Sequence, residues 1–225
     1  MSVPSLGQIF TAQNLIGLAL LIVAFTLHEL SHGVVAYSLG DDTGKKQGRL
    51  TLNPWVHIDL FMTVLLPFMI LVSTGGAGWF GGAKPMPVVT ENFKKPRRDL
   101  AIVAAAGPLS NWILALFATM LGAVLIRLGW MASRGFWPRA FEQFLTLNLF
   151  LVALNLLPIP PLDGYKVMRI FLPKTVTHKL DRLDWLGVMI VLLLLVSSWT
   201  QGWIFRYSRS LEPSVRWVER VINPQ

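Results

Sequence analysis

The sequence contains no cysteine and only 14% charged residues, and each shortage excludes classes of protein. Without a thiol there is no disulfide scaffold, no thiolate zinc site and no cysteine nucleophile, so any metal must be held by His, Asp or Glu. Hydrophobic residues make up 53% of the chain, and the mean hydropathy is +0.54. Such a composition is typical of an integral membrane protein embedded in a lipid bilayer.

Positive charge is in excess, with a net charge of +8, but the Lys and Arg residues lie in loops between apolar runs. In such loops basic residues set membrane topology and contact anionic lipid, so we expect no nucleic-acid partner. No Lys or Arg precedes Leu15, whereas a cleavable signal peptide begins with positive charge. We therefore expect the first apolar run to remain in the mature protein.

Long apolar runs predict an all-α polytopic membrane protein with about four full transmembrane helices. These runs are residues 15–39, 100–128, 141–157 and 183–205. A shorter run, residues 60–72, is interrupted by Pro67, which favours a re-entrant segment over a crossing one. Apolar residues at helical intervals behind Pro213 predict an amphipathic tail helix over residues 211–225.

Two short stretches on either side of the re-entrant segment favour strands. Residues 48–54 alternate briefly before a turn, and residues 84–89 have prolines at their edge. With the re-entrant segment between them, they predict a small membrane-associated β and re-entrant region over residues 45–90. No repeat or linker marks a second domain, so the sequence predicts a single membrane domain over residues 1–225 with its core at 14–172.

The distribution of basic residues predicts the topology. If residues 60–72 do not cross the membrane, one side holds thirteen Lys and Arg, against three in residues 127–139 and four in the tail. If they do cross, the two sides hold ten each. The positive-inside rule favours the first arrangement, a multi-pass protein of the cell membrane with its active site toward the cytoplasm. A basic tail on the outer side fits this arrangement poorly, so the side of the tail is left open.

The first apolar run carries the clearest chemical motif of the sequence, His28-Glu29-x-x-His32. Residues four apart share a face of a helix, so two imidazoles can bind one metal ion while Glu29 acts on a water molecule there. An ionisable cluster at that depth in a bilayer is costly, and its default reading is a functional one. The alternative is that these side chains merely pair with polar groups of neighbouring helices.

Asp163 is the best remaining candidate for a third metal ligand. Pro158, Pro160 and Pro161 cannot continue a helix, so the third apolar run must unwind just before it. Unwound backbone at membrane depth lies inside protein or beside a water-filled cavity, and a hydrolase needs such a cavity. Two histidines, one carboxylate and one water complete a catalytic site that favours zinc. An ordinary surface turn at Asp163-Gly164 is the alternative.

These motifs together resemble the site-two protease family of intramembrane zinc metalloproteases. The resemblance rests on three motifs: Phe25-x-x-His28-Glu29-x-x-His32, Gly107-Pro108-x-x-Asn111, and Asn155-x-x-Pro158-x-x-Pro161-Leu162-Asp163-Gly164. It implies that His28, His32 and Asp163 bind one zinc ion per chain. It further implies that Glu29 is the catalytic base and that Asn155 helps to hold the substrate or the oxyanion. Nothing in the sequence resembles the PDZ or CBS domains of other members.

The function implied by the resemblance is that of a zinc metalloendopeptidase that cleaves peptide bonds in or near transmembrane segments of membrane-protein substrates, as in regulated intramembrane proteolysis. One alternative is a divalent-ion transporter, which predicts polar residues staggered along the spans; residues 103–126 contain few. A second is a catalytically silent relative that acts as a binding or quality-control factor, against which the intact Glu29 argues. Nothing in the sequence predicts an oligomeric state.

Three further features have structural interpretations. His57, at a loop margin, is expected to be a surface or hydrogen-bonding histidine. Asn111 with Gly107 is expected to permit close helix packing. Residues 49–53 could pair as a strand with an unwound substrate, and plain packing is the alternative.

Overall fold

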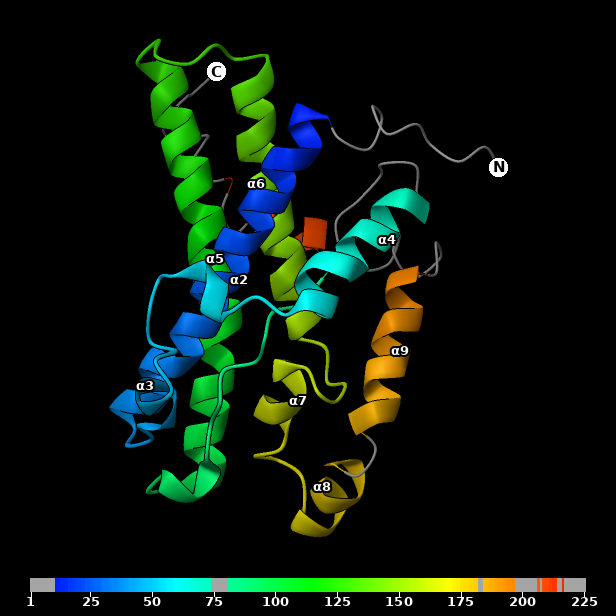
Figure 1. The fold of residues 1–225 in the computed structure, drawn as a ribbon. Helices are drawn as coiled ribbons and strands as arrows, with labels where there is room; N and C mark the ends of the chain where they lie inside the picture. The colour runs from blue at the N-terminus through cyan, green and yellow to red at the C-terminus, as the bar shows by residue number, and fades with distance from the viewer. Residues whose placement is uncertain are drawn as a thin grey trace.

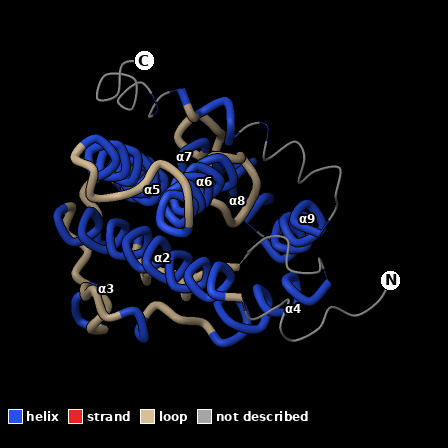
Figure 2. The backbone as a smooth tube through the Cα atoms, turned by 90° about the horizontal axis from the view of Figure 1, so that it is seen from above, coloured by secondary structure: helices blue, strands red, loops and turns tan. Residues whose placement is uncertain are grey.

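The computed structural model describes residues 11–73, 81–181, 184–196 and parts of 206–216, and it shows helices joined by turns and loops (Figures 1 and 2). The helices are α2 (Ala12–Ser38), α3 (Thr43–Lys46), α4 (Leu66–Ser73), α5 (Pro96–Arg127), α6 (Phe136–Asn155), α7 (Asp163–Met168), α8 (Lys174–Asp181) and α9 (Asp184–Val196). A π-helical turn, Leu60–Leu65, leads into α4, and 3₁₀ turns cover Pro54–Val56 and Thr90–Asn92.

Helices α2, α5 and α6 lie side by side as the central bundle (Figure 1). Helix α5 packs against α2, α6 and α7, which makes it the shared neighbour of these three helices. Its buried face is built largely from small residues: Ala101, Ala104, Ala106, Gly107, Ala115, Ala118, Gly122 and Ala123. Small side chains allow helix backbones to approach closely, so this composition brings α2 and α7 close to the middle of α5.

Two helices of the described part, α2 and α5, are long and apolar enough to cross a membrane. Large apolar side chains cover their outer faces and are exposed, as a lipid-facing surface requires. They include Leu15, Val23 and Val34 on α2 and Leu109, Ile113 and Phe117 on α5. The third and fourth apolar runs also form helices, α6 and the described part of α9. That these two cross the membrane stays a prediction.

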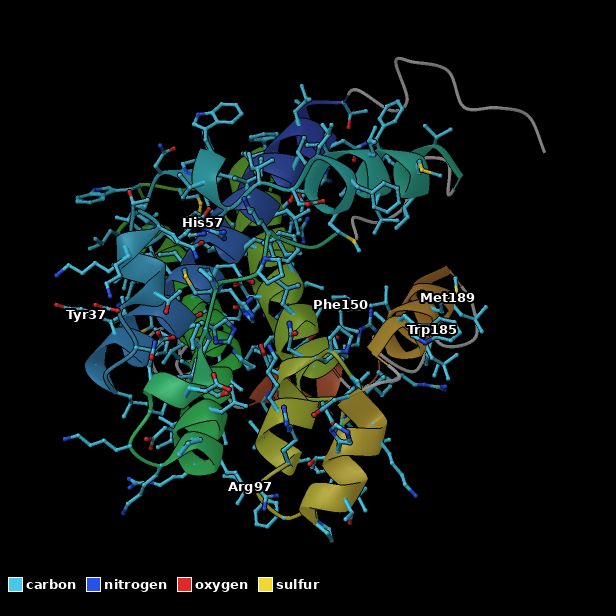
Figure 3. All side chains as sticks on the ribbon, turned by 60° about the horizontal axis from the view of Figure 1, so that its bottom comes forward. Tyr37, His57, Arg97, Phe150, Trp185 and Met189 are labelled. Atoms are coloured by element: carbon cyan, nitrogen blue, oxygen red, sulfur yellow. The ribbon has the colours of Figure 1, made fainter. Side chains whose placement is uncertain are left out.

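The predicted re-entrant segment is helical and stands beside the bundle together with α9 (Figures 1 and 2). Ile70 of α4 clusters with Phe150 and Leu154 of α6, and Val191 of α9 packs against this cluster. Phe150 lies on the side of α6 that faces α9 (Figure 3). Helix α4 and helix α9 therefore form a second, smaller layer against α6.

The predicted β region is not formed in the described residues, because residues 48–54 and 84–89 contain no strand. The N–H groups of residues 84–89 bond to groups on other segments. They are therefore not available for the hydrogen bonds between two paired strands. Lys84 donates to the His57 carbonyl at 2.8 Å, Met86 to Glu29 Oε2 at 2.6 Å and Val89 to Asp41 Oδ2 at 2.8 Å. Proline at positions 85 and 87 supplies no further donor.

Most of the predicted tail helix, residues 211–225, lies outside the described residues, as do residues 197–205 of the fourth run. The surface position considered for His57 is wrong, because this side chain is only 2% exposed. Its Nε2 lies 3.0 Å from the carbonyl oxygen of Thr51, so the hydrogen-bonding interpretation is confirmed.

Asp41 connects the end of α2 to the loop that precedes α5 through hydrogen bonds. Its buried carboxylate accepts hydrogen bonds from the N–H groups of Thr43 at 3.1 Å and Val89 at 2.8 Å. It also accepts from the Thr43 hydroxyl at 2.5 Å and from Asn92 Nδ2 at 2.7 Å. Burial by itself raises the pKa of Asp41, but the hydrogen bonds outweigh burial and hold this pKa below its ordinary value. The ionised carboxylate is thus the form that the fold stabilises.

We predict that Asp41→Ala lowers the free energy of unfolding at pH 7 by about 1 to 3 kcal/mol, because four hydrogen-bond donors lose their acceptor. The folded-state pKa lies below the unfolded one. The carboxylate therefore stabilises the fold above the unfolded pKa of about 4, and this contribution is lost as the pH falls further. Thermal unfolding in detergent at pH 7 and at pH 3.5 should show a smaller gap between wild type and variant at the lower pH. An equal gap at both pH values would contradict this role.

Candidate metal centre

Two histidine rings meet on the inward face of α2. His28 and His32 are one helical turn apart, and they are 5% and 6% exposed. Their ring centroids lie 4.7 Å apart, and their Nε2 atoms are separated by 3.1 Å. Two imidazole nitrogens with their lone pairs turned toward the same point form half of a tetrahedral metal site.

Asp163 joins this pair from the first turn of α7. Its Oδ2 atom lies 3.2 Å from His28 Nε2 and 3.1 Å from His32 Nε2. The carboxylate reaches this place because α6 ends at Asn155 and the proline-containing stretch turns the chain back. Gly164 permits the approach, because a Cβ atom there would lie only 2.6 Å from the carbonyl oxygen of Leu157.

The three ligand atoms form a nearly equilateral triangle of the size that a metal ion requires. Ligand atoms about 2.0 to 2.1 Å from a tetrahedral zinc ion lie roughly 3.3 Å from one another. Within the described residues, the close polar neighbours of the buried Asp163 Oδ2 are the two ring nitrogens. In the described part of the chain, the cluster of potential metal ligands consists of His28, His32 and Asp163.

Helix α5 supplies the acceptors behind the histidines. The Nδ1 atom of His32 lies 2.7 Å from the Val103 carbonyl oxygen, and that of His28 lies 2.9 Å from Asn111 Oδ1. A ring that donates through Nδ1 keeps its proton there and leaves the Nε2 lone pair for a metal. The sequence-based interpretation of Asn111 as a packing residue did not predict its contact with His28. The available signal was an amide side chain in the middle of a long apolar run.

Gly107 leaves the space into which both imidazoles fit. A Cβ atom at this position would lie 2.6 Å from His28 Nε2 and would collide with His32 Nε2 as well. Such distances are shorter than real Cβ contacts, so any larger residue would move the rings. The glycine of the Gly107-Pro108 motif therefore belongs to the site, in addition to allowing close helix packing.

Glu29 is held beside the histidines by a backbone donor. Its Oε2 accepts a hydrogen bond of 2.6 Å from the N–H group of Met86, which stands between two prolines. Arg49 is buried close to this carboxylate and donates to the Lys84 carbonyl oxygen at 2.7 Å. Burial lowers the pKa of Arg49, and the negative charge of Glu29 opposes that change. The segment around Lys84 and Met86 therefore fixes the position of the carboxylate.

Asn155 lines the same cavity as the histidines. Its Nδ2 donates to the Leu151 carbonyl oxygen at 3.0 Å, within its own helix. Lys166 lies at the opposite side of the Asp163 carboxylate, with Nζ 3.1 Å from Oδ1. The two oxygens of Asp163 are thus divided between the histidines and a lysine. His57 is not part of the cluster.

A cavity of about 740 Å³ opens onto the ligand triangle. Apolar side chains from several elements dominate its wall, and they include Phe25, Leu66, Leu151, Leu154, Val188 and Val191. Its polar lining includes Glu29, Asp59, Asn155, Lys166 and Arg169. A large, mostly apolar cleft with a few convergent polar groups has the character of a substrate site.

Comparison with known proteins identifies the family. The profile described as "Peptidase family M50" matches residues 122–197, a stretch that contains Asn155 and Asp163. Bacillus subtilis YwhC is 45% identical over 181 residues, which cover 79% of this chain and 78% of that protein. The chain belongs to peptidase family M50, the site-two proteases. The resemblance drawn from the sequence motifs is therefore confirmed.

Two mycobacterial proteins match as well. Rip2 of Mycolicibacterium smegmatis is 34% identical over 198 residues, covering 84% of this chain and 72% of that protein. Rip2 of Mycobacterium tuberculosis H37Rv is 32% identical over 184 residues, covering 82% and 68%. YwhC and both Rip2 proteins carry provisional names as zinc metalloproteases. No solved structure matches the chain. Membership of the family together with two apolar helices makes this an integral membrane protein.

We predict that Gly107→Ala lowers bound zinc to well below half of the wild-type amount, because the added methyl group displaces both imidazoles. Gly122→Ala, on the same helix, is the matched control. A Cβ atom there meets Phe141 at 3.5 Å, an ordinary contact. Metal analysis of detergent-purified proteins measures the difference. A Gly107→Ala variant that keeps the wild-type zinc content would show that the rings do not sit where the structure places them.

Proposed function

We propose that this protein is an intramembrane zinc metalloendopeptidase that hydrolyses peptide bonds in or near the transmembrane segments of membrane-protein substrates. The observation that carries the proposal is the buried cluster of His28, His32 and Asp163, two of whose members stand on a helix able to cross a membrane. Ionisable groups at bilayer depth are expensive and mark functional sites. The names of the relatives support zinc as the ion. The single cluster of potential ligands in the described residues supports one ion per chain.

In the proposed chemistry, three residues bind the metal ion and a fourth, Glu29, acts as the base. His28, His32 and Asp163 hold the ion, and zinc, when bound, supplies a Lewis acid that acidifies water and polarises a carbonyl group. Glu29 takes the proton of the attacking water and passes it to the leaving amine. The hydrogen bond from Met86 to Oε2 supports this role, because it fixes the carboxylate and leaves its second oxygen to accept the proton.

Asn155 is proposed to bind the carbonyl oxygen of the scissile peptide bond. A primary amide has two N–H donors, and the hydrogen bond to the Leu151 carbonyl oxygen uses one of them. The position of Asn155 on the cavity wall supports the use of the other donor toward a developing oxyanion. In this role Asn155 contacts the substrate without contacting the metal.

The apolar cavity supports a substrate that is an unwound hydrophobic segment. A transmembrane helix hides its carbonyl groups in its own hydrogen bonds, so local unwinding must precede attack. A cavity of about 740 Å³ has room for several side chains of such a segment. We further propose a multi-pass protein of the cell membrane whose active site lies on the cytoplasmic side, where thirteen Lys and Arg residues gather.

The polar side chains of α5 support a hydrolase rather than an ion transporter. Within Val103 to Ile126 of this helix, Ser110 and Thr119 donate to carbonyl oxygens of the helix itself, and Asn111 contacts His28. A transporter needs polar groups staggered along a path through the membrane. These side chains are committed to the bundle and to the metal site.

We predict that Glu29→Gln retains bound zinc and loses cleavage. The amide keeps the size of the side chain but cannot take a proton, and removal of a general base costs about 10²- to 10⁴-fold in rate. The purified variant is reconstituted in liposomes with a panel of single-span polypeptides, and the products are identified by mass spectrometry.

Glu91→Gln is the matched control, because this exposed glutamate is absent from the cavity wall. It should cleave at the wild-type rate. Full activity of Glu29→Gln would refute the assignment of the base. A wild-type protein that binds zinc but cleaves no member of the panel would favour the catalytically silent relative.

A further inference from the structure

The side chain of Asn111 is buried in the middle of the bundle with no exposed surface. Its Oδ1 atom lies 2.9 Å from His28 Nδ1, a residue 83 positions away in the sequence. A small apolar residue would serve close helix packing at least as well, because a buried amide costs free energy unless it is hydrogen-bonded. The Nδ2 atom of Asn111 is buried and finds no hydrogen-bond partner among the described residues, so packing does not account for the amide.

The contact between Asn111 and His28 determines which ring nitrogen carries the proton. An amide oxygen accepts, so the proton of the neutral imidazole stays on Nδ1 and the lone pair of Nε2 points to Asp163. With an apolar side chain at position 111, the proton could move to Nε2 and block the ligand position. His28 could also rotate about its side-chain bonds, because no other hydrogen bond of the described residues holds its Nδ1.

The other histidine is oriented in a different way. His32 Nδ1 lies 2.7 Å from the carbonyl oxygen of Val103, which is a backbone atom. No substitution of Val103 removes this acceptor. Helix α5 thus provides two acceptors behind the imidazoles, and only the one on Asn111 depends on the identity of the residue.

We propose that Asn111 is a positioning residue of the metal centre: its amide oxygen holds His28 in the tautomer and orientation that bind the ion. This inference rests on the proposed function in one respect, that the cluster binds zinc. Because the amide of Asn111 is neutral, it orients the ring without adding a second negative charge next to Asp163. Removing such a partner of a metal-bound histidine typically costs 10- to 100-fold in metal affinity.

The experiment compares two buried asparagines of the same bundle. Asn111→Leu removes the acceptor, and Asn148→Leu is the matched control. Asn148 is also 0% exposed and has an unsatisfied amide atom, but its Nδ2 donates to the Phe144 carbonyl oxygen of its own helix. Zinc affinity of the full-length proteins in detergent is measured by competition with a chromogenic chelator. We expect Asn111→Leu to bind zinc about 10- to 100-fold more weakly, and Asn148→Leu to bind it like the wild type.

A spectroscopic readout separates orientation from folding. Cobalt(II) replaces zinc, and its visible absorption bands report the ligand geometry. Asn111→Asp keeps the size of the side chain and offers a stronger acceptor, so it should retain tight binding and shift these bands. This variant also decides the question if Asn111→Leu does not fold, because an unchanged spectrum would then overturn the proposal.

The outcomes distinguish this inference from the proposed function. A folded Asn111→Leu variant with wild-type zinc affinity would overturn the positioning role alone. Equal weakening in Asn148→Leu would do the same, because it would trace the loss to the bundle as a whole. A wild-type chain that binds neither zinc nor cobalt would overturn the proposed function and this inference together.

Discussion

The cost of burying ionisable side chains in an apolar helix governs the rest of this structure. His28, Glu29 and His32 stand on a helix that is long and apolar enough to cross a membrane, where a polar or charged side chain is costly unless it is paired. Their partners lie on three other segments of the chain. Helix α5 faces the Nδ1 atoms, the loop before α5 donates to the glutamate, and α7 brings a carboxylate to the Nε2 atoms. The elements that surround α2 thus supply the hydrogen-bond and charge partners of one helical turn, the turn that carries His28, Glu29 and His32.

The same constraint explains why some elements are irregular. Helix α6 must stop at Asn155 so that the following prolines can return the chain and place Asp163 against the imidazoles. The loop between α4 and α5 forgoes strand pairing and uses the Met86 N–H group on Glu29. Helix α5 has glycine at position 107 because the imidazoles occupy the space of a side chain. Each departure from regular structure serves the site.

The sequence alone predicted the helical runs, the pairing of His28 with His32 and the approach of Asp163, because spacing within a helix and proline chemistry are local. It could not predict the role of Asn111, since hydrophobic periodicity does not show which residue faces a histidine on another helix. The predicted strands failed for a related reason. Residues 84–89 were predicted as a strand with prolines at its edge, but the N–H groups of Met86 and Val89 bond to side chains distant in sequence, Glu29 and Asp41.

If two histidines and one aspartate hold the metal, the zinc content of the purified protein must depend on Asp163. Wild type should carry close to one zinc per chain after purification in detergent, and Asp163→Asn should carry far less. Asp59→Asn is the control, because this carboxylate lines the same cavity but lies outside the ligand cluster. It should keep the wild-type content. A zinc-free wild type, or an Asp163→Asn variant with undiminished zinc, would contradict the account.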